Sequence, residues 1–369
     1  IVAPIIYSCC AVLRLARFNV DHVEADQLQG HDRFRGLPSP GAAAVAIALV
    51  LAYFGIEDTK LVQLDDNVIF SARAVMLQAT PFAENDVVTG PHQGLLGIAL
   101  HPDFTTNGWV YVLACTEGGG MESDRIQVIR YTDTPGMEAG TNRTVIVDDL
   151  PMSAINNGGD LVFGQETPNP RLYVSLGDTE DMDAPQTDGM LSGRVLRYAD
   201  DGSIPADNPT ADDPEWVRGL RNTFGMDIQP ETGELFGADN GPASGDELNY
   251  LRKGKNFEWG GLPPGFPPGD IGIVMQTWVD VIVPTGLAWH DGTGWGTDYA
   301  NDLFLTSYED QAVRRFELSG TSFVNVDLEE VFAQFEEDGI DHKPLDVEIG
   351  ADGSLIVSTF TGIYRIFKE

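Results

Sequence analysis

Basic residues and cysteines are scarce in this chain. Its 369 residues include 22 Lys and Arg against 57 Asp and Glu, a formal net charge of -35 at pH 7. Because such a polyanion repels phosphates, the balance argues against DNA or RNA as a partner. The acids are scattered along the chain, as on a solvated surface. Three cysteines, Cys9, Cys10 and Cys115, are too few for a disulfide framework, and no bridge is expected between two neighbours.

Several catalytic signatures are also missing. The sequence contains no GxSxG, no HExxH, no phosphate-binding GxxxxGK[ST] and no Cys/His zinc spacing. These absences remove the sequence support for a serine hydrolase, a zinc protease, a P-loop nucleotide enzyme or a zinc module. At 42% hydrophobic residues the chain can nevertheless bury a sizeable core, which excludes general disorder.

One pattern recurs five times along the chain. Each copy is a short alternating apolar strand, a turn rich in Pro, Asp, Asn or Gly, and a second apolar strand. The copies begin at Leu95, Gly158, Phe224, Thr285 and Leu345. The second strands are anchored by Tyr111, Tyr173, Phe236, Phe304 and Ile356. A hairpin repeated at this spacing predicts an all-β chain folded as a β-propeller, with a β-sandwich of ordinary hairpins as the alternative.

The first sixty residues have a different character. Residues 40–56 form a 17-residue uncharged apolar run, long enough to cross a thin bilayer. Four arginines precede it, Arg14, Arg17, Arg33 and Arg35. The positive-inside bias then predicts that everything after Glu57 lies on the periplasmic or extracellular face. We therefore expect two parts, a helical transmembrane-like fragment over 1–57 and a propeller domain over 58–369.

The same amino-terminal segment carries a resemblance of its own. LRLARFNV at 13–20 and FRGLPSPGAAA at 34–44 resemble the CDP-alcohol phosphatidyltransferases, and phosphatidylserine synthase in particular. The spaced Asp residues of that family's DGxxAR stretch are not present, so phospholipid synthesis is not expected. The resemblance implies a membrane fragment that could anchor the chain.

The rest of the chain, from about residue 65 to 369, resembles the PQQ-dependent glucose/sorbosone dehydrogenases, the soluble aldose sugar dehydrogenases. The stretches that carry the resemblance are QGLLGIALHPDF (93–104), NGGDLVFG (157–164), LYVSLGD (172–178), GRVLRYADDGSIPADNP (193–209), GLRNTFGMDIQPETGELFGADNGP (219–242) and GDELNYLRKGKNFEWG (245–260).

This resemblance implies a six-bladed propeller that holds PQQ in a central cleft. It also implies that calcium would lie at the quinone, that an imidazole would take the proton of the sugar C1 hydroxyl, and that the quinone would accept the hydride. Five hairpins are visible and the missing one is at the start, so we expect a truncated first blade. Closure of the ring between first and last strands is then in doubt, and an open edge is an aggregation hazard.

The resemblance also assigns residues to the cofactor and the metal. Arg221 and Asn222, in GLRN, match the pair that contacts the quinone, and an arginine there suits a carboxylate. An arginine ion-paired at the base of a loop is the alternative interpretation. Gly241 and Pro242, in DNGP, match the loop whose backbone carbonyls ligate calcium.

Three more residues complete the predicted site. Asp246 and Glu247 follow the DNGP loop at a spacing that could hold a hard cation through oxygen ligands, although a solvated acidic turn explains them equally well. Gln93 matches a residue close to the sugar, but a surface glutamine would look the same.

Departures from the family pattern fall at the site itself. The family writes HNGG where this chain writes NNGG, so Asn156 stands in place of the catalytic histidine, and an amide cannot act as a general base near neutral pH. Glu309 replaces a usual cofactor-binding lysine. Lys343 and Leu345 stand where the aldose enzymes carry two arginines, which leaves Lys343 as the predicted cofactor cation at that end.

Two functions remain open from the sequence. His92, beside Gln93, and His342, beside Lys343, are candidate replacement bases, although a lone histidine is more often a surface or packing residue. With a working base, the chain is a calcium- and PQQ-dependent dehydrogenase that oxidises aldoses at C1 and passes electrons to quinones or dyes. Without one, it is a catalytically silent propeller that binds a ligand or a protein through the same face.

Overall fold

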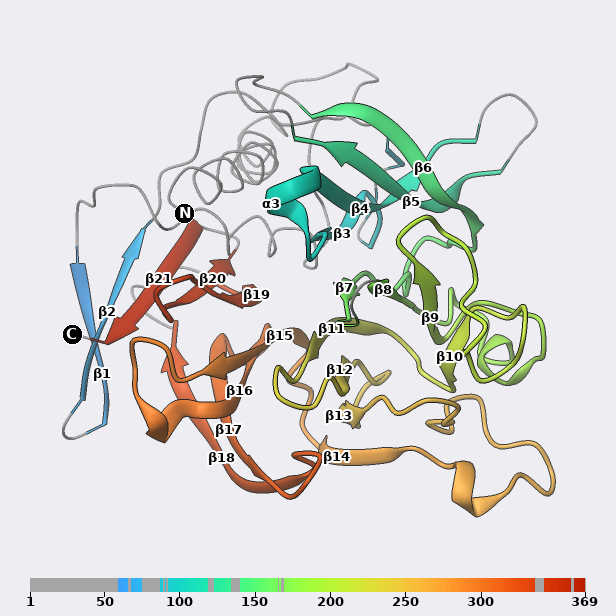
Figure 1. Cartoon of the computed structure of the whole chain (residues 1–369). Coiled ribbons are helices and arrows are strands. Elements are labelled where there is room, and N and C mark those ends of the chain that lie inside the picture. The colour runs from blue at the N-terminus through green and yellow to red at the C-terminus, as the bar shows by residue number, and fades with distance from the viewer. Residues whose placement is uncertain are drawn as a thin grey trace, which may run out of the picture.

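A computed structural model gives the fold of the protein. It describes residues 59–65, 68–74, 87–88, 90, 92–118, 123–133, 140–164, 166, 169–335, 342–359 and 362–368. These residues form five antiparallel sheets arranged radially, each with one edge strand nearest the middle of the ring (Figure 1). The all-β propeller predicted from the repeat is therefore confirmed, and the β-sandwich alternative is wrong.

Four of the sheets are continuous segments of four strands. One contains β3 (Leu95–Leu100), β4 (Trp109–Thr116), β5 (Arg125–Thr132) and β6 (Thr141–Leu150). The next contains β7 (Leu161–Phe163), β8 (Arg171–Leu176), β9 (Arg194–Ala199) and β10 (Glu215–Arg218). It is followed by β11 (Thr223–Ile228), β12 (Leu235–Asp239), β13 (Asp246–Tyr250) and β14 (Ile273–Trp278). The fourth contains β15 (Pro284–Asp291), β16 (Ala300–Ser307), β17 (Ala312–Ser319) and β18 (Asn325–Gln334).

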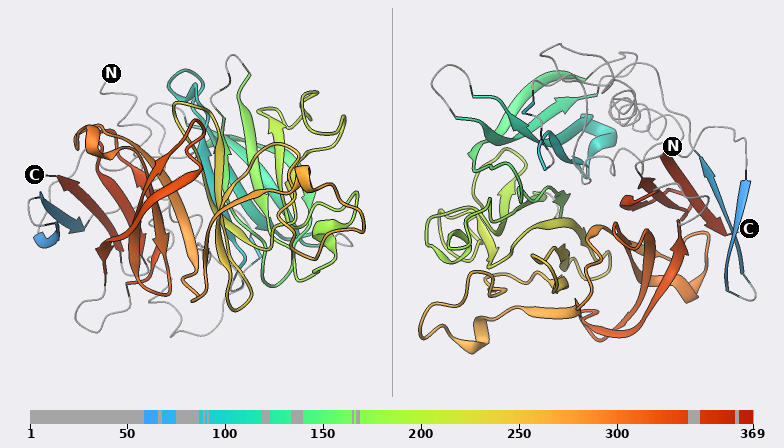
Figure 2. Two further views of the ribbon diagram at one scale, coloured as in Figure 1. Left: turned by 90° about the horizontal axis from the view of Figure 1, so that it is seen from below. Right: turned by 180° about the vertical axis from the view of Figure 1, so that it is seen from behind.

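The fifth sheet joins the two ends of the described chain. It contains β19 (Pro344–Ile349), β20 (Leu355–Thr359), β21 (Gly362–Lys368), β2 (Val68–Ala74) and β1 (Thr59–Asp65). Strand β2 pairs antiparallel with β21, with Ala72 opposite Ile366 (Figure 2). The backbone groups of β21 that face β2 are thereby paired instead of forming an open edge. The predicted six blades are corrected to five within the described residues, because strands expected to begin a separate first blade complete the last one.

Short helices lie in the connections. They are α3 (Phe104–Asn107) and the 3-10 turns η2 (Ala184–Gln186), η3 (Pro268–Asp270) and η4 (Thr297–Tyr299). The α3 turn ends at Gly108, whose φ of 66° is left-handed and which lies so close to the Asp133 carbonyl that a Cβ would meet it at 2.3 Å. Glycine is therefore required where the first hairpin reverses.

The core lies between neighbouring blades. The predicted second-strand anchors Tyr111, Phe236, Phe304 and Ile356 are fully buried, and Tyr173 is nearly so. Strands inside a blade, such as β4, are buried along nearly their whole length, whereas the outer strands β6 and β18 are largely exposed.

The blades are also tied together near the axis. Asp160, just before β7, accepts the Met226 N–H of the next blade at 2.6 Å, and Asp227 accepts the Trp289 N–H of the blade after that at 2.8 Å. Asp160 is buried and Asp227 is half-buried. Each of these hydrogen bonds ties the backbone of an inner strand to a side chain of the preceding blade. They therefore fix successive inner strands relative to one another.

The predicted membrane segment is not among the parts that the structure describes. Within the described ranges, no helix is long and apolar enough to cross a membrane. The apolar run at 40–56 and the fragment at 1–57 lie outside the described ranges, so both stay predictions. The location outside the cytoplasm also stays a prediction.

A candidate site at one end of the ring

The predicted site residues precede the inner strands of successive blades. His92 lies just before β3, Asn156 lies before β7, and Arg221 and Asn222 lie before β11. Since every inner strand runs in the same direction, the residues before these strands meet at one end of the ring. The structure links them by hydrogen bonds over more than sixty residues of sequence.

His92 and Asn156 are in direct contact. The Asn156 backbone N–H donates to His92 Nδ1 at 3.1 Å, and the side-chain nitrogen of Asn157 donates to the His92 carbonyl at 2.6 Å. Asn156 is buried and left-handed, with φ 57°. Asn156, which stands in place of the family's base, and His92, the candidate replacement base, therefore belong to one cluster.

The hydrogen bond to Asn156 defines the state of the His92 ring. Nδ1 accepts a backbone donor, so the proton of the neutral ring is assigned to Nε2. Burial lowers the pKa of His92 below its usual 6.5, the charge of Arg221 lowers it further, and Glu180 opposes the shift. As arranged, His92 is a neutral ring with its proton on Nε2.

Asp178 is the central acceptor of the site, and sequence reasoning did not single it out. Asn156 Nδ2 donates to its Oδ1 at 3.0 Å, and the Glu180 N–H donates to the same oxygen at 3.0 Å. Trp259 Nε1 donates to Oδ2 at 2.9 Å. A carboxylate has about four acceptor positions, so these three donors leave one on Oδ2. The only sequence signal was its place at the end of LYVSLGD.

Arg221 joins this cluster to the DNGP loop. Its Nη1 donates to the Asn240 and Gly241 carbonyls, both at 2.9 Å, and its guanidinium lies 5.6 Å from the centre of the Trp259 ring. Asn222 accepts the Gly158 N–H at 3.0 Å, which links it to the loop of Asn156.

The backbone of the Arg221 loop is held by one buried carboxylate. Asp239 accepts the N–H groups of Arg221 and Asn222 at 2.9 and 2.8 Å, and the Thr223 hydroxyl at 2.8 Å. Burial raises the pKa of Asp239 to about 6, against the lowering effect of these bonds and of the nearby guanidinium.

The predicted metal-binding residues differ in their burial and in whether their oxygen atoms already accept hydrogen bonds. Asp246 is buried and accepts three backbone N–H groups, from Gly241, Ile282 and Val283, each at 2.9 Å. Glu247 is half-buried, and burial raises its pKa to about 7. Pro242 is exposed. No group of three or more His, Cys, Asp or Glu in the described part of the chain is arranged to hold a metal ion.

Lys343 and Glu309 form a charge pair farther round the ring. Lys343 Nζ lies 3.3 Å from Glu309 Oε2 and 4.4 Å from the centre of the Tyr308 ring. The Glu309 backbone N–H donates to Ile282 O, next to the segment that Asp246 holds. The two family departures therefore compensate each other in charge.

Two further predicted residues contact neighbouring segments of the chain. Gln93 donates through Nε2 to the Ser153 carbonyl at 2.8 Å, which fixes the loop leading to Asn156. His342 is paired with Tyr364, whose hydroxyl lies 3.2 Å from Nδ1. His92 contacts the Asn156 cluster directly, whereas the contact of His342 is to Tyr364.

A buried arginine organises the loop between Asp178 and β9. Arg194 is fully buried and donates to the carbonyls of Ala184, Thr187 and Ser192, while its Nε lies 2.6 Å from Glu215. A charge in this position is stable only because all three guanidinium nitrogens meet acceptors.

Comparison with known proteins agrees with the fold and the motifs. The family model for glucose/sorbosone dehydrogenase matches residues 68–364. Aldose sugar dehydrogenase YliI of Escherichia coli is 28% identical over 301 residues, covering 74% of this chain and 76% of the relative. Quinoprotein glucose dehydrogenase B of Acinetobacter calcoaceticus is 29% identical over 192 residues, covering 45% of this chain and 39% of the relative.

A solved structure gives the same fold. The PQQ-bound form of an aldose sugar dehydrogenase from Streptomyces coelicolor superposes with a TM-score of 0.66 at 23% identity, covering 84% of this chain and 91% of that one. The predicted phosphatidyltransferase resemblance of residues 1–57 has no support in these comparisons, because the matching family model begins at residue 68. Over residues 68–364, most of its length, the chain belongs to the glucose/sorbosone dehydrogenase family.

Proposed function

We propose that the protein is a quinoprotein that binds PQQ and an aldose and oxidises the sugar at C1. The observation that carries the proposal is the hydrogen-bonded cluster of His92, Asn156, Asp178 and Arg221 at one end of the ring, in a chain of this family. It combines a neutral imidazole, a carboxylate and a guanidinium, the groups that a hydroxyl substrate and an anionic cofactor require.

The residues present fit PQQ at Arg221. PQQ is planar and carries three carboxylates, and only Nη1 of the guanidinium is used by the Asn240 and Gly241 carbonyls. The other guanidinium nitrogens can therefore hold a carboxylate, with Asn222 beside them. When bound, PQQ supplies the two-electron acceptor for the C1 hydrogen. Lys343 would add a second cation after its pairing with Glu309 is relaxed.

Calcium fits less directly. The predicted ligands are the carbonyls of Gly241 and Pro242, and Arg221 already donates to the first of these. A cation placed there would meet a positive charge on the same oxygen, so Arg221 has to withdraw before calcium is held. Asp246 can assist only through the one acceptor position left on Oδ1, because three backbone N–H groups occupy the others.

Proton removal is the step that this chain must solve differently. Asn156 cannot accept a proton, and His92 has its lone pair on Nδ1 pointed at the Asn156 N–H. His92 acts as a base only after that bond opens. Asp178 is buried and has one acceptor position left, on Oδ2, which would accept a hydrogen bond from a sugar hydroxyl that enters the cluster. We propose His92 as the base, with Asp178 orienting the hydroxyl.

A second candidate function follows from Asn156 itself. Its amide satisfies Asp178 in the way a histidine N–H would, so the site is stable without an imidazole at that position. A propeller that keeps this arrangement can bind a sugar, or another ligand, without turning it over.

Titration of the full-length protein with PQQ and calcium separates the two functions. The absorbance of the quinone reports binding, and dye reduction with several aldoses reports turnover. The dehydrogenase predicts binding and turnover together. Binding without turnover would favour the non-catalytic propeller, and absence of PQQ binding would contradict the quinoprotein proposal.

A further inference from the structure

Trp259 is a half-buried aromatic ring at the centre of the cluster. Its indole N–H donates to Asp178 Oδ2 at 2.9 Å, and the Arg221 guanidinium lies 5.6 Å from its ring centre. Asp178 in turn holds Asn156, so the ring lies one hydrogen-bonded residue away from the position where the family has its base.

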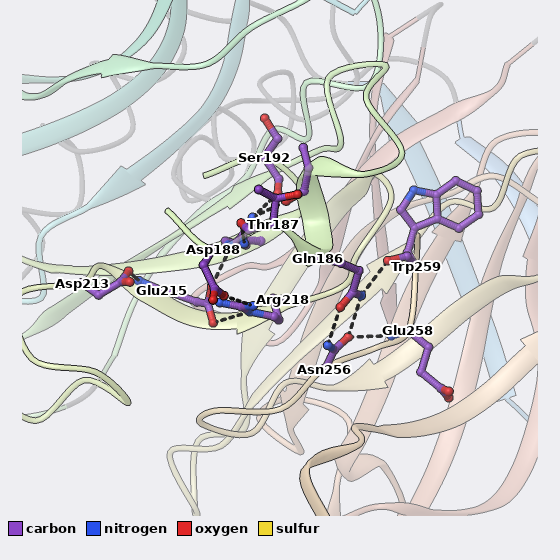
Figure 3. Close-up of polar contacts among 12 residues, drawn as sticks. Gln186, Thr187, Asp188, Ser192, Asp213, Glu215, Arg218, Asn256, Glu258 and Trp259 are labelled. Carbon is purple, nitrogen blue, oxygen red and sulfur yellow. Dashed lines mark hydrogen bonds and ion pairs between the residues drawn. The ribbon is translucent and has the colours of Figure 1, made fainter. Parts of the chain in front are cut away.

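The backbone around Trp259 is held on both sides. The Trp259 N–H donates to Gly219 O at 2.9 Å, and Gln186 Nε2 donates to the Trp259 carbonyl at 2.7 Å. Gln186 and Asn256 exchange two amide hydrogen bonds, at 2.9 and 2.7 Å, and the indole projects away from this pair (Figure 3). The ring is thus positioned before any ligand arrives, which lowers the entropic cost of binding.

Another tryptophan of similar burial lacks this setting. Trp216 is also half-buried, but Arg197 lies 4.8 Å from its ring centre and Tyr173 packs edge-on at 5.4 Å. Its N–H is used by the Leu251 carbonyl at 2.8 Å. Trp216 therefore supports the packing between two blades, whereas the N–H of Trp259 ends on a site carboxylate.

The charges beside Trp259 favour a neutral sugar ring over a ring that carries carboxylates. Asp178 accepts its N–H, Glu258 is its exposed neighbour in sequence, and Glu180 lies beside Asp178 and acts on His92. Carboxylates repel a tricarboxylate, but they accept hydrogen bonds from hydroxyls. A neutral pyranose has hydroxyls at its edge and an apolar C–H face that packs on an aromatic ring.

We infer that Trp259 is the platform on which the pyranose ring of the substrate stacks, with Asp178 accepting from a hydroxyl at its edge. This assigns a positioning and specificity-determining residue to the site, and it rests on the proposed sugar-oxidising function. The Arg221 guanidinium, 5.6 Å from the centre of the Trp259 ring, is left to the anionic cofactor.

Three variants test the inference in the full-length protein with PQQ and calcium present. Trp259→Leu removes the ring, Trp259→Phe keeps a ring but loses the N–H, and Trp216→Phe is the matched control. Binding of D-glucose is measured by calorimetry and KM and kcat by dye reduction. We expect Trp259→Leu to weaken binding and raise KM about tenfold or more, the loss typical of a central aromatic contact. Trp259→Phe should stay within about threefold of the wild type, because it keeps the stacking face.

The outcomes distinguish failure of the stacking role of Trp259 from failure of the proposed sugar oxidation. Wild-type oxidation of glucose with an unchanged KM in Trp259→Leu overturns the platform alone. An equal loss in Trp259→Phe and Trp259→Leu also overturns it, since the N–H and not the ring would then matter. A wild-type protein that neither binds nor oxidises any aldose overturns both proposals. An equal effect of Trp216→Phe would assign the loss to stability.

Discussion

At position 156 the chain carries an amide whose nitrogen donates to Asp178 Oδ1 at 3.0 Å. A histidine placed there can make the same bond through Nδ1–H, which would leave Nε2 free to accept a proton from a sugar hydroxyl. We therefore expect Asn156→His to raise kcat by about 10²- to 10⁴-fold, the usual contribution of a positioned general base. Dye reduction with a saturating aldose measures the change.

The control for this substitution is Asn156→Ala, which removes the amide without supplying a base. It should not raise kcat at all. If Asn156→His binds PQQ and sugar like the wild type but gains no activity, position 156 does not face the substrate hydroxyl and the proposed geometry is wrong.

Arg221 is the second residue on which the chemistry depends, because it faces both predicted ligands. Its charge attracts the carboxylates of PQQ, while its bond to Gly241 O opposes a cation on that oxygen. Arg221→Gln should weaken PQQ binding about tenfold or more, since hydrogen bonds to charged groups contribute roughly 1.5–3 kcal/mol. In the absence of PQQ, the same variant should bind calcium more tightly than the wild type.

Calorimetric titrations with calcium alone and with PQQ measure the two affinities. The exposed Arg252 provides the matched control, and Arg252→Gln should change neither. A fall in calcium affinity on removal of Arg221 would contradict the competition for Gly241 O.

Sequence reasoning found part of this residue-scale picture. His92, Asn156 and Arg221 could be assigned to one site because the family resemblance places their motifs at the cofactor cleft. Asp178 and Trp259 were missed because their bond joins residues 81 apart, and neither has a local pattern that marks it. The hydrogen bond from Arg221 to Gly241 O also has no local pattern in the sequence. The Gly241 carbonyl was therefore predicted as a calcium ligand without the arginine that competes for it.

Among elements, the loop from Asp178 to β9 depends on one buried side chain. Arg194 satisfies three carbonyls of this loop and pairs with Glu215. Arg194→Met should lower the free energy of unfolding by roughly 3 kcal/mol, because it leaves these acceptors buried without donors. It should also expose the loop to proteolysis and weaken sugar binding, since Gln186 of the same loop holds Trp259. Thermal unfolding and limited proteolysis measure the effects.

The same cluster offers a control. Arg218 also pairs with Glu215, but its other partner, Asp188, is exposed, so Arg218→Met should cost much less stability. Equal losses in the two variants would mean that the charge of Glu215, and not the buried carbonyls, is what Arg194 stabilises.

The blades themselves were the part of the fold most open to prediction. Alternation and turn residues are local, so five hairpins in the sequence correspond to five hairpins in five sheets. The pairing of β2 with β21 leaves no such trace, because it joins residues such as Ala72 and Ile366 across nearly the whole chain. The number of blades was therefore predicted wrongly although each hairpin was predicted correctly.

For the whole molecule, the ties between blades make stability depend on pH. Burial raises the pKa of Asp160 and of Asp227 to about 7, against the lowering effect of their backbone hydrogen bonds, and it raises the pKa of Asp346 well above its usual 3.8. A carboxyl whose pKa is higher in the folded state binds its proton more tightly there. Its stabilising contribution is complete below about pH 4 and is lost as the pH rises through about 7.

We therefore expect the melting temperature to fall by several degrees between pH 5 and pH 8, a shift that a few kcal/mol produces in a chain of this size. Repulsion within a chain of net charge -35 acts in the same direction, but it is screened by salt, whereas the buried carboxyls are not. Scanning calorimetry in about 0.5 M NaCl, where the Debye length is only a few Å, isolates the buried groups.

Asp227→Asn tests the assignment directly. The amide offers one acceptor oxygen for two N–H donors, Ile228 and Trp289, so the variant should melt lower at every pH. Because an amide does not titrate, its melting temperature should also change less between pH 5 and pH 8. A wild-type melting temperature that is constant or rises over this range in high salt would show that the ring is held by ionised carboxylates. The bonds from Asp160 to Met226 and from Asp227 to Trp289 would then be charge-assisted, and the blades would be most firmly joined above neutrality.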